Sequence, residues 1–247
     1  MARPDDVFAK LVARGEPGAE PGGTPPVPAA TVVLLRDGDG GGIETLMVRR
    51  ASSLAFAGGM WVFPGGRVDP EDIDPGMPDD ELATARRAAV REAQEESALI
   101  VDAAALVPFA HWMPPPEAPK RFSTWFFIGR APLDGAVTID GGEIHDHAWL
   151  PPAGALERRD AGELELAPPT WVTLHRLAEY DGVDAAIAEA EASDPDFFVT
   201  HVARVEGGMA ALWAGDAGYE ARDASVPGPR HRLLMVEGAW RYEHDAG

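Results

Sequence analysis

Cysteine is absent from this 247-residue sequence. Its absence excludes disulfide bonds, zinc sites built on thiolates and cysteine nucleophiles. Long apolar runs are also missing, since none approaches the ~18 residues of a membrane helix. Residues 1–15 lack the apolar core of a signal peptide. We therefore expect a cytoplasmic protein that does not enter a membrane.

Basic residues are scarce as well. The chain has 21 Lys and Arg against 41 Asp and Glu, a formal charge of −20. This balance argues against a broad basic face that binds a nucleic-acid polymer or an anionic membrane. Small anionic substrates are not excluded, because a bound metal ion reverses the sign of the charge locally.

Glycine and proline are frequent, with 27 and 23 residues, and they divide the chain into short elements. Residues 1–30 end in a Pro/Gly-rich stretch, which predicts a flexible N-terminal segment. Apolar and β-branched runs predict strands within 31–36, 43–48, 60–63, 99–101, 106–112, 122–128 and 137–150. The strand at 60–63 is expected to end in a turn at Pro64-Gly65-Gly66.

A helix is predicted from Asp79 or Asp80 to about Ser97. Its start is acidic, its interior lacks glycine and proline, and small or apolar residues recur every three or four positions. Further helices are predicted at 153–158, 170–180 and 183–193, and the last strands at 197–205 and 231–236. Strands before and after one acidic helix indicate an α+β fold with a mixed sheet.

Three carboxylates share one face of this helix, because Glu92, Glu95 and Glu96 lie within an arc of about 100°. A solvated acidic face is the simpler explanation of such a run. The glycine pair Gly65-Gly66 directly after a strand favours another one, since glycine allows a backbone to approach anionic oxygens closely. Clustered carboxylates suit a hard divalent cation such as Mg²⁺ or Mn²⁺.

The ordered combination resembles the Nudix box, G-x5-E-x7-R-E-U-x-E-E-x-G-U with U apolar. Gly66 matches its first glycine, Arg91-Glu92 its central pair, Glu95-Glu96 its paired acids, and Leu99 its last apolar residue. The run LMVRRASSLAFAGGMWVFPGG (46–66) and the stretch HWMPPPEAPKRFSTWFFIG (111–129) resemble the coenzyme A diphosphatase-like, peroxisomal-type branch of the family and its bacterial relatives.

Three departures from the box are visible. From Gly66 to Arg91 is 91 − 66 = 25 positions where the box has 14, an insertion of 25 − 14 = 11 residues. Ala83 stands where counting back from Arg91 places the first Glu of the box, and Ala98 replaces its late glycine. The acids that could substitute for that first Glu are Asp69, Glu71, Asp72 and Glu81.

The resemblance implies a Nudix-type α/β/α sandwich over residues 31–153, with a mixed sheet and a catalytic helix. Residues 154–247 are then a C-terminal helical and strand extension packed on this core, whose role is a lid, a homodimer surface or a partner site. It also implies Mg²⁺ or Mn²⁺ bound by Glu92, Glu95 and Glu96. Gly65 and Gly66 would hold the loop, and Arg91 would orient the acids. Glu95 and Glu143 are the two candidates for the base that activates water.

The implied activity is metal-dependent hydrolysis of the diphosphate bond in a small nucleoside diphosphate derivative, with coenzyme A or acyl-coenzyme A as one substrate class. ADP-ribose, a nucleotide sugar or NADH is the second. A ligand-sensing domain without turnover is a third reading, suggested by Ala83 and Ala98. Arg49, Arg50 and Arg121 are candidates for contacts to substrate phosphates. His145 and His147 would share a strand face, where a structural role is favoured over metal binding.

Overall fold

The computed structural model describes residues 25–51, 58–118, 120–133, 135–139, 141–236 and 240–245. Most of the N-terminal segment predicted to be flexible, residues 1–24, lies outside this range. The chain divides into two compact units. The larger unit comprises Val27–His111 and Phe122–Asp196, and the smaller one comprises Met1–Pro26, Trp112–Arg121 and Phe197–Gly247.

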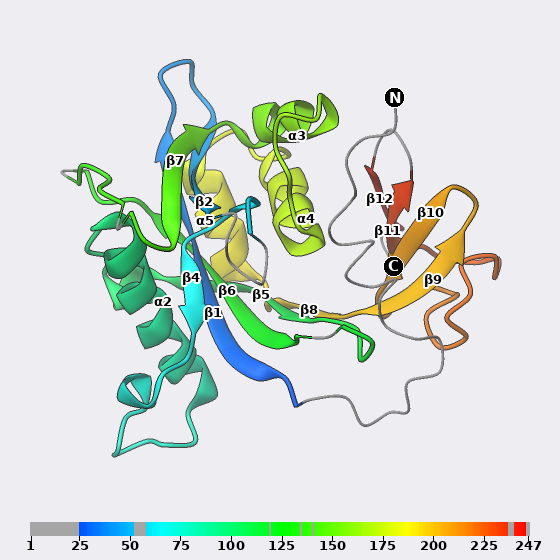
Figure 1. The fold of residues 1–247 in the computed structure, drawn as a ribbon, viewed down its shortest axis with the longest axis horizontal. Helices are drawn as coiled ribbons and strands as arrows, with labels where there is room; N and C mark the ends of the chain where they lie inside the picture. Colours follow the sequence, from blue (N-terminus) through cyan, green and yellow to red (C-terminus); the bar gives the residue numbers. More distant parts are fainter. Residues whose placement is uncertain are drawn as a thin grey trace. The chain divides into compact units, whose positions relative to one another are not determined.

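The main sheet is mixed, as the sequence predicted. Its path is β3-β2-β1-β6-β5-β8, with β4 paired to β1 and β7 paired to β2 (Figure 1). The central pair β1 and β6 is parallel, whereas β1–β2, β1–β4 and β2–β7 are antiparallel. The strands are β1 (Val27–Asp37), β2 (Ile43–Arg50), β3 (Trp61–Val62), β4 (Gly65–Arg67), β5 (Val107–Met113), β6 (Phe122–Arg130), β7 (Ile144–Leu150) and β8 (Asp196–Val199).

The helix α2 (Glu81–Ser97) confirms the predicted acidic helix. The Asp80 side chain caps its start by accepting a hydrogen bond from the Ala83 amide at 2.9 Å. Its alanine face packs on the sheet, because Ala85, Ala89 and Ala93 are buried in one cluster with apolar residues of β1. The helix ends at Ala98, whose backbone is left-handed with φ 58°. This is the position at which the Nudix box has glycine, the residue that adopts such a conformation most readily.

Three more helices follow the strands of the larger unit: α3 (Pro152–Asp160), α4 (Pro168–Leu177) and α5 (Val183–Ala192). Single-turn 3₁₀ helices lie at η1 (Pro70–Asp72) and η2 (Ala103–Ala105). The predicted strand at 99–101 is wrong: the segment is irregular and contributes the buried side chains of Leu99 and Val101 to the core. The apolar residues of this segment therefore indicate that it is buried in the core, and they do not indicate a strand.

The smaller unit contains an antiparallel sheet in the order β12-β11-β10-β9. Its strands are β9 (His201–Val205), β10 (Gly208–Leu212), β11 (His231–Val236) and β12 (Trp240–His244). The predicted strand 197–205 is interrupted at Thr200, which separates β8 from β9. Arg232, a residue of β11, donates two hydrogen bonds of 2.6 Å to the buried Asp216. The predicted domain boundary at residues 153 and 154 stays a prediction.

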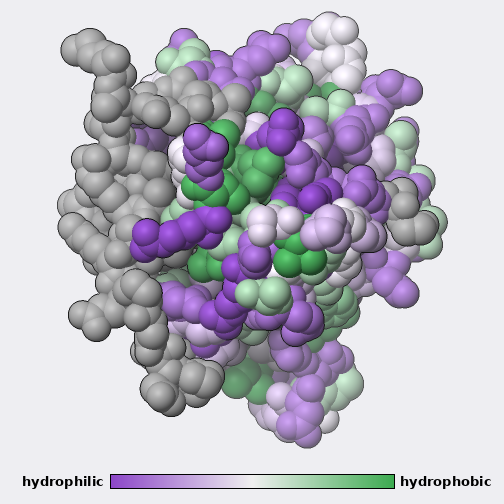
Figure 2. All heavy atoms as spheres, turned by 90° about the vertical axis from the view of Figure 1, so that its right-hand side faces the viewer, coloured by the Kyte–Doolittle hydropathy of each residue, from purple (hydrophilic) through white to green (hydrophobic). Residues whose placement is uncertain are grey.

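Hydrophilic side chains cover much of the face shown in Figure 2, and hydrophobic ones show in smaller areas between them. Such a surface fits the formal charge of −20. Of the helices that the structure describes, none is long and apolar enough to cross a membrane.

Candidate active site

The glycine pair Gly65-Gly66 forms part of a strand. The turn predicted at this point is wrong, because β4 pairs with β1 through Thr31↔Gly65 and Ala30↔Gly66. A Cβ atom on Gly66 would collide with the Glu92 carboxylate, and one on Gly65 would collide with the backbone and side chain of β1. The two glycines therefore allow α2 to place its carboxylates directly on the backbone of β4.

Glu96 is the most buried of the three helix acids, with 6% of its surface exposed. Its Oε2 accepts a hydrogen bond of 3.0 Å from the Gly65 amide. The pKa of Glu96 is raised to about 8, chiefly by burial and in smaller part by the negative charges of Glu92 and Glu143. The Gly65 hydrogen bond and the Arg50 charge act in the opposite direction. The site thus holds a carboxyl group that lacks sufficient positive charge around it.

Arg50, the last residue of β2, brings Glu143 to Glu96. Its Nη1 lies 3.7 Å from Glu96 Oε1, and its Nη2 lies 3.3 Å from Glu143 Oε2. The backbone fixes the segment before β7 as well, because the Ala51 amide donates to the Glu143 carbonyl at 2.7 Å. Glu143, named from sequence as a base candidate, therefore lies beside the buried acid of α2.

Arg91 holds the other side of the site together. All five of its N–H groups donate hydrogen bonds, and their acceptors are Asp72 twice, Glu92, Glu95 and the carbonyl of Arg67. The hydrogen bonds to Asp72 hold the pKa of Arg91 above its usual range. All N–H groups of Arg91 are thus engaged, two of them with Glu92 and Glu95, and its role in orienting these acids stays a prediction.

Asp72 is the loop acid that meets Arg91. It is only 4% exposed, and η1 presents both of its carboxylate oxygens to the guanidinium. The other three loop candidates are placed differently: Asp69 lies 3.8 Å from Arg91, Glu81 accepts from the Trp125 indole, and Glu71 is exposed. The sequence offered four acids as substitutes for the first Glu of the Nudix box. It could not distinguish between them, because the 11-residue insertion changes the distance from Gly66 to Arg91.

The three predicted ligands occupy different surroundings. Glu92 lies against Gly66, and burial raises its pKa. Glu95 has 57% of its side chain exposed and accepts from Arg91 at 3.1 Å. Across the described ranges, no three His, Asp or Glu side chains are already grouped as metal ligands. The chemistry of the set nevertheless fits a divalent cation, because carboxylates are ligands that such ions prefer. The buried Glu96 also experiences the negative charges of both Glu92 and Glu143.

The remaining sequence candidates lie elsewhere. Arg49 is exposed and donates to the Gly59 carbonyl, and Arg121 belongs to the smaller unit. On β7, His145 is exposed and His147 is half-buried. Of the three candidate arginines, Arg50 is the one that the described residues place against the acids, at Glu96 and Glu143.

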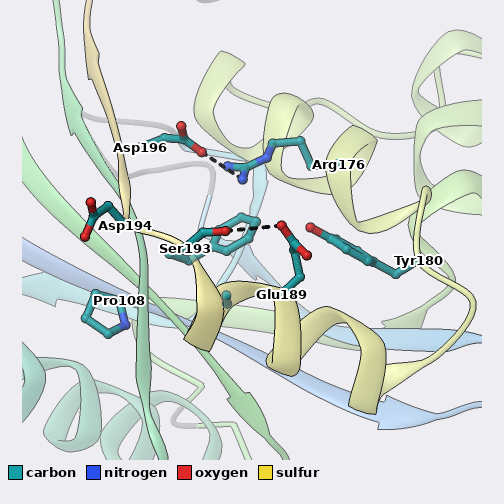
Figure 3. Close-up of a pocket in the computed structure, with 9 residues that line it drawn as sticks. Pro108, Arg176, Tyr180, Glu189, Ser193, Asp194 and Asp196 are labelled. Carbon is teal, nitrogen blue, oxygen red and sulfur yellow. Dashed lines mark hydrogen bonds and ion pairs between the residues drawn. The ribbon is translucent and has the colours of Figure 1, made fainter. Parts of the chain in front are cut away.

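A pocket of about 230 Å³ lies where α4 and α5 meet β5 (Figure 3). Its polar groups interact with one another: Arg176 pairs with Asp196 at 2.8 Å, and Ser193 donates to Glu189 at 3.1 Å. The guanidinium of Arg176 also stacks on the Phe109 ring at 4.1 Å. None of the acids on α2 lines this pocket, so it is separate from the candidate active site.

The NUDIX domain model matches residues 25–170, which include Arg50, Gly65, Gly66, Asp72, the acids of α2 and Glu143. The chain belongs to the Nudix family. The putative nudix hydrolase 7 of Caenorhabditis elegans is 26% identical over 171 residues, which are 55% of this chain and 56% of that protein. The mitochondrial Nudix hydrolase 15 of Arabidopsis thaliana is 34% identical over 74 residues, 30% of this chain and 22% of that protein.

A solved structure supports the same assignment. A NUDIX hydrolase from Alicyclobacillus acidocaldarius is 27% identical and has a TM-score of 0.60, covering 67% of this chain and 96% of its own. The Nudix chain described here spans about half the length of the Caenorhabditis relative and less of the Arabidopsis one. Nudix hydrolases generally use divalent metal ions.

Proposed function

We propose that this Nudix protein is a metal-dependent hydrolase that cleaves the diphosphate bond of a nucleoside diphosphate derivative. The observation that carries the proposal is Glu96, a buried carboxyl group on the Gly65 amide whose pKa is raised to about 8. A buried acid of this kind is costly to the fold unless a cation accompanies it, and strongly perturbed acids cluster at functional sites.

Glu92, Glu95 and Glu96 are the proposed ligands of Mg²⁺ or Mn²⁺. The bound ion would polarise phosphoryl oxygens and neutralise charge on the leaving phosphate. Gly65 and Gly66 allow these acids to approach β4, and Arg91 fixes the direction of Glu92 and Glu95.

Glu143 is the proposed base that takes a proton from the attacking water. It lies beside Glu96 through Arg50, and 64% of its side chain is exposed, so water and substrate can reach it. Glu95 is the other candidate, and its carboxylate accepts a hydrogen bond from Arg91 at 3.1 Å.

Coenzyme A and acyl-coenzyme A are the proposed substrate class, on the resemblance of residues 46–66 and 111–129 to that branch. The test is a panel of coenzyme A, acetyl-coenzyme A, ADP-ribose, NADH and nucleoside triphosphates with Mg²⁺ or Mn²⁺, scored by phosphate-bearing products. Wild type should cleave a coenzyme A compound fastest, and Glu96→Gln should lose at least about 100-fold in kcat.

The matched control is Glu71→Gln, which neutralises an exposed acid of the loop and should keep the wild-type rate. If ADP-ribose or NADH is cleaved faster than the coenzyme A compounds, the substrate class is that of ADP-ribose or NADH instead. Tight binding of one compound without turnover would establish a sensing domain and contradict the proposed hydrolase.

A further inference from the structure

Arg50 and Arg91 are the two arginines at the candidate active site, and they are bonded very differently. Arg91 donates five hydrogen bonds, whereas Arg50 makes one long hydrogen bond of 3.3 Å and one ion pair of 3.7 Å. Its Nε is buried and has no hydrogen-bond partner among the residues that the structure describes. Geometry therefore fixes Arg91 firmly, while Arg50 is held mainly by charge.

Arg50 places a positive charge beside the buried carboxylate of Glu96. Glu92 and Glu143 both act on Glu96 as like charges, and Arg50 is the cation that opposes them there. The Arg50 side chain is 19% exposed and that of Glu96 is 8%, so water screens the pair weakly. Three carboxylates would repel one another strongly if this cation were removed.

We infer that Arg50 is an internal counter-ion of Glu96, which neutralises the Glu96 carboxylate until a divalent metal ion bound there replaces it. The inference rests on the proposed metal-dependent function. The guanidinium and the metal ion compete for the Glu96 carboxylate, the one proposed ligand that Arg50 contacts. The Arg50 charge therefore keeps the metal-free fold intact and at the same time weakens binding of the metal.

Metal affinity tests this competition directly. Binding of Mn²⁺ is measured by isothermal titration calorimetry on the full chain, for wild type, Arg50→Met, Arg50→Lys and Arg49→Met. Arg50→Met removes the charge but keeps an apolar stem, and it should bind Mn²⁺ about tenfold more tightly. Arg50→Lys keeps the charge, and Arg49→Met alters the exposed neighbour, so both should stay within about twofold of wild type.

Equal or weaker Mn²⁺ binding by Arg50→Met would overturn the inference, because a supporting residue does not compete with the metal. If wild type binds Mn²⁺ and hydrolyses its substrate while Arg50→Met binds unchanged, only the counter-ion role fails. If wild type binds no Mn²⁺ at all, the proposed function fails together with it.

A second measurement uses wild type alone, in case Arg50→Met does not fold. The Arg50 Nε–H group is buried, so its NMR signal should exchange slowly with water in the metal-free protein. Saturating Mg²⁺ should shift this signal and speed its exchange, while the Arg91 signal stays protected. An Arg50 signal that does not respond to saturating Mg²⁺ contradicts the replacement.

Discussion

Arg91 and Asp72 form a two-point ion pair across 19 residues of sequence, with Arg91 Nε and Nη2 donating to Asp72 Oδ1 and Oδ2 at 3.1 and 2.9 Å. The pair joins η1 to the middle of α2. Because Arg91 also binds Glu92 and Glu95, the position of these acids depends on an aspartate in the loop.

Asp72→Asn should therefore impair both stability and activity. Removing one partner of a buried ion pair costs about 3–5 kcal/mol when the other charge is left uncompensated. Arg91 keeps Glu92 and Glu95 as partners, so we expect a smaller loss of about 2–3 kcal/mol in the free energy of unfolding. Denaturant unfolding measures the loss, and kcat should fall with it. The control is Asp74→Asn, which weakens the more exposed pair with Arg87 and should cost less than about 1 kcal/mol. Equal effects of the two substitutions would contradict the role given to Asp72.

Ala98→Gly should stabilise the protein. Ala98 ends α2 with φ 58°, a conformation that costs alanine roughly 1 kcal/mol and glycine almost nothing. The control is Ala178→Gly at the end of α4, where φ is −68° and glycine should destabilise the fold by about 0.5–1 kcal/mol. Both alanines are exposed, so thermal unfolding of the two variants compares backbone conformation alone. A destabilising Ala98→Gly would show that the left-handed end is not strained.

Glu96→Gln should stabilise the metal-free protein increasingly as the pH rises. The pKa of Glu96 is raised to about 8 in the folded state, above its ordinary value of 4.5, so the folded state binds the proton more tightly. The associated stability is fully present below pH 4.5 and is lost as the pH rises through about 8. The glutamine avoids this loss, which we place at about 2 kcal/mol or more at pH 8.

Denaturant unfolding of Glu96→Gln and wild type between pH 5 and 9 in a metal chelator measures the difference. A gap that is constant over this range would show that Glu96 titrates normally. Saturating Mg²⁺ should reverse the order, because a ligand of the native state stabilises wild type and not the variant.

Glu143→Gln should lower kcat by about 100-fold or more, since general base catalysis contributes that much. Metal affinity should change far less than the rate if Glu143 serves mainly as base. Glu95→Gln, on the other side of the site, should mainly weaken metal binding. Steady-state kinetics at several Mg²⁺ concentrations separates the two effects. A larger loss of kcat in Glu95→Gln at saturating Mg²⁺ would assign the base to Glu95.

Local sequence predicted α2 well, because its cap, its alanine face and its length are all encoded within the segment itself. The three acids Glu92, Glu95 and Glu96 were found by the same reasoning, from their spacing along the helix. The strand β4 was missed, since glycine has a low preference for strands and Gly65-Gly66 is extended only through pairing with β1. Tertiary contact decides this element, and one sequence does not contain that information locally.

The contributions of Arg50 and Asp72 were likewise hidden. Arg50 was one of three candidate arginines, and the choice depends on a strand end that meets Glu143, 93 residues away. Asp72 was one of four acids in a loop whose length departs from the usual box. Only the folded structure distinguishes Arg50 and Asp72 from the other candidates, because it brings them into contact with acids or arginines distant in sequence.

The η1 turn allows the loop that follows it to vary in length and sequence. Because Asp72 is fastened to α2 in space, the residues between Ile73 and Asp79 do not determine where the acids of the helix point. Lengthening such a loop costs little chain entropy. Evolution can therefore use this stretch as an adjustable insert, and relatives of this chain should be recognised by an aspartate that meets the arginine and not by a fixed count of residues.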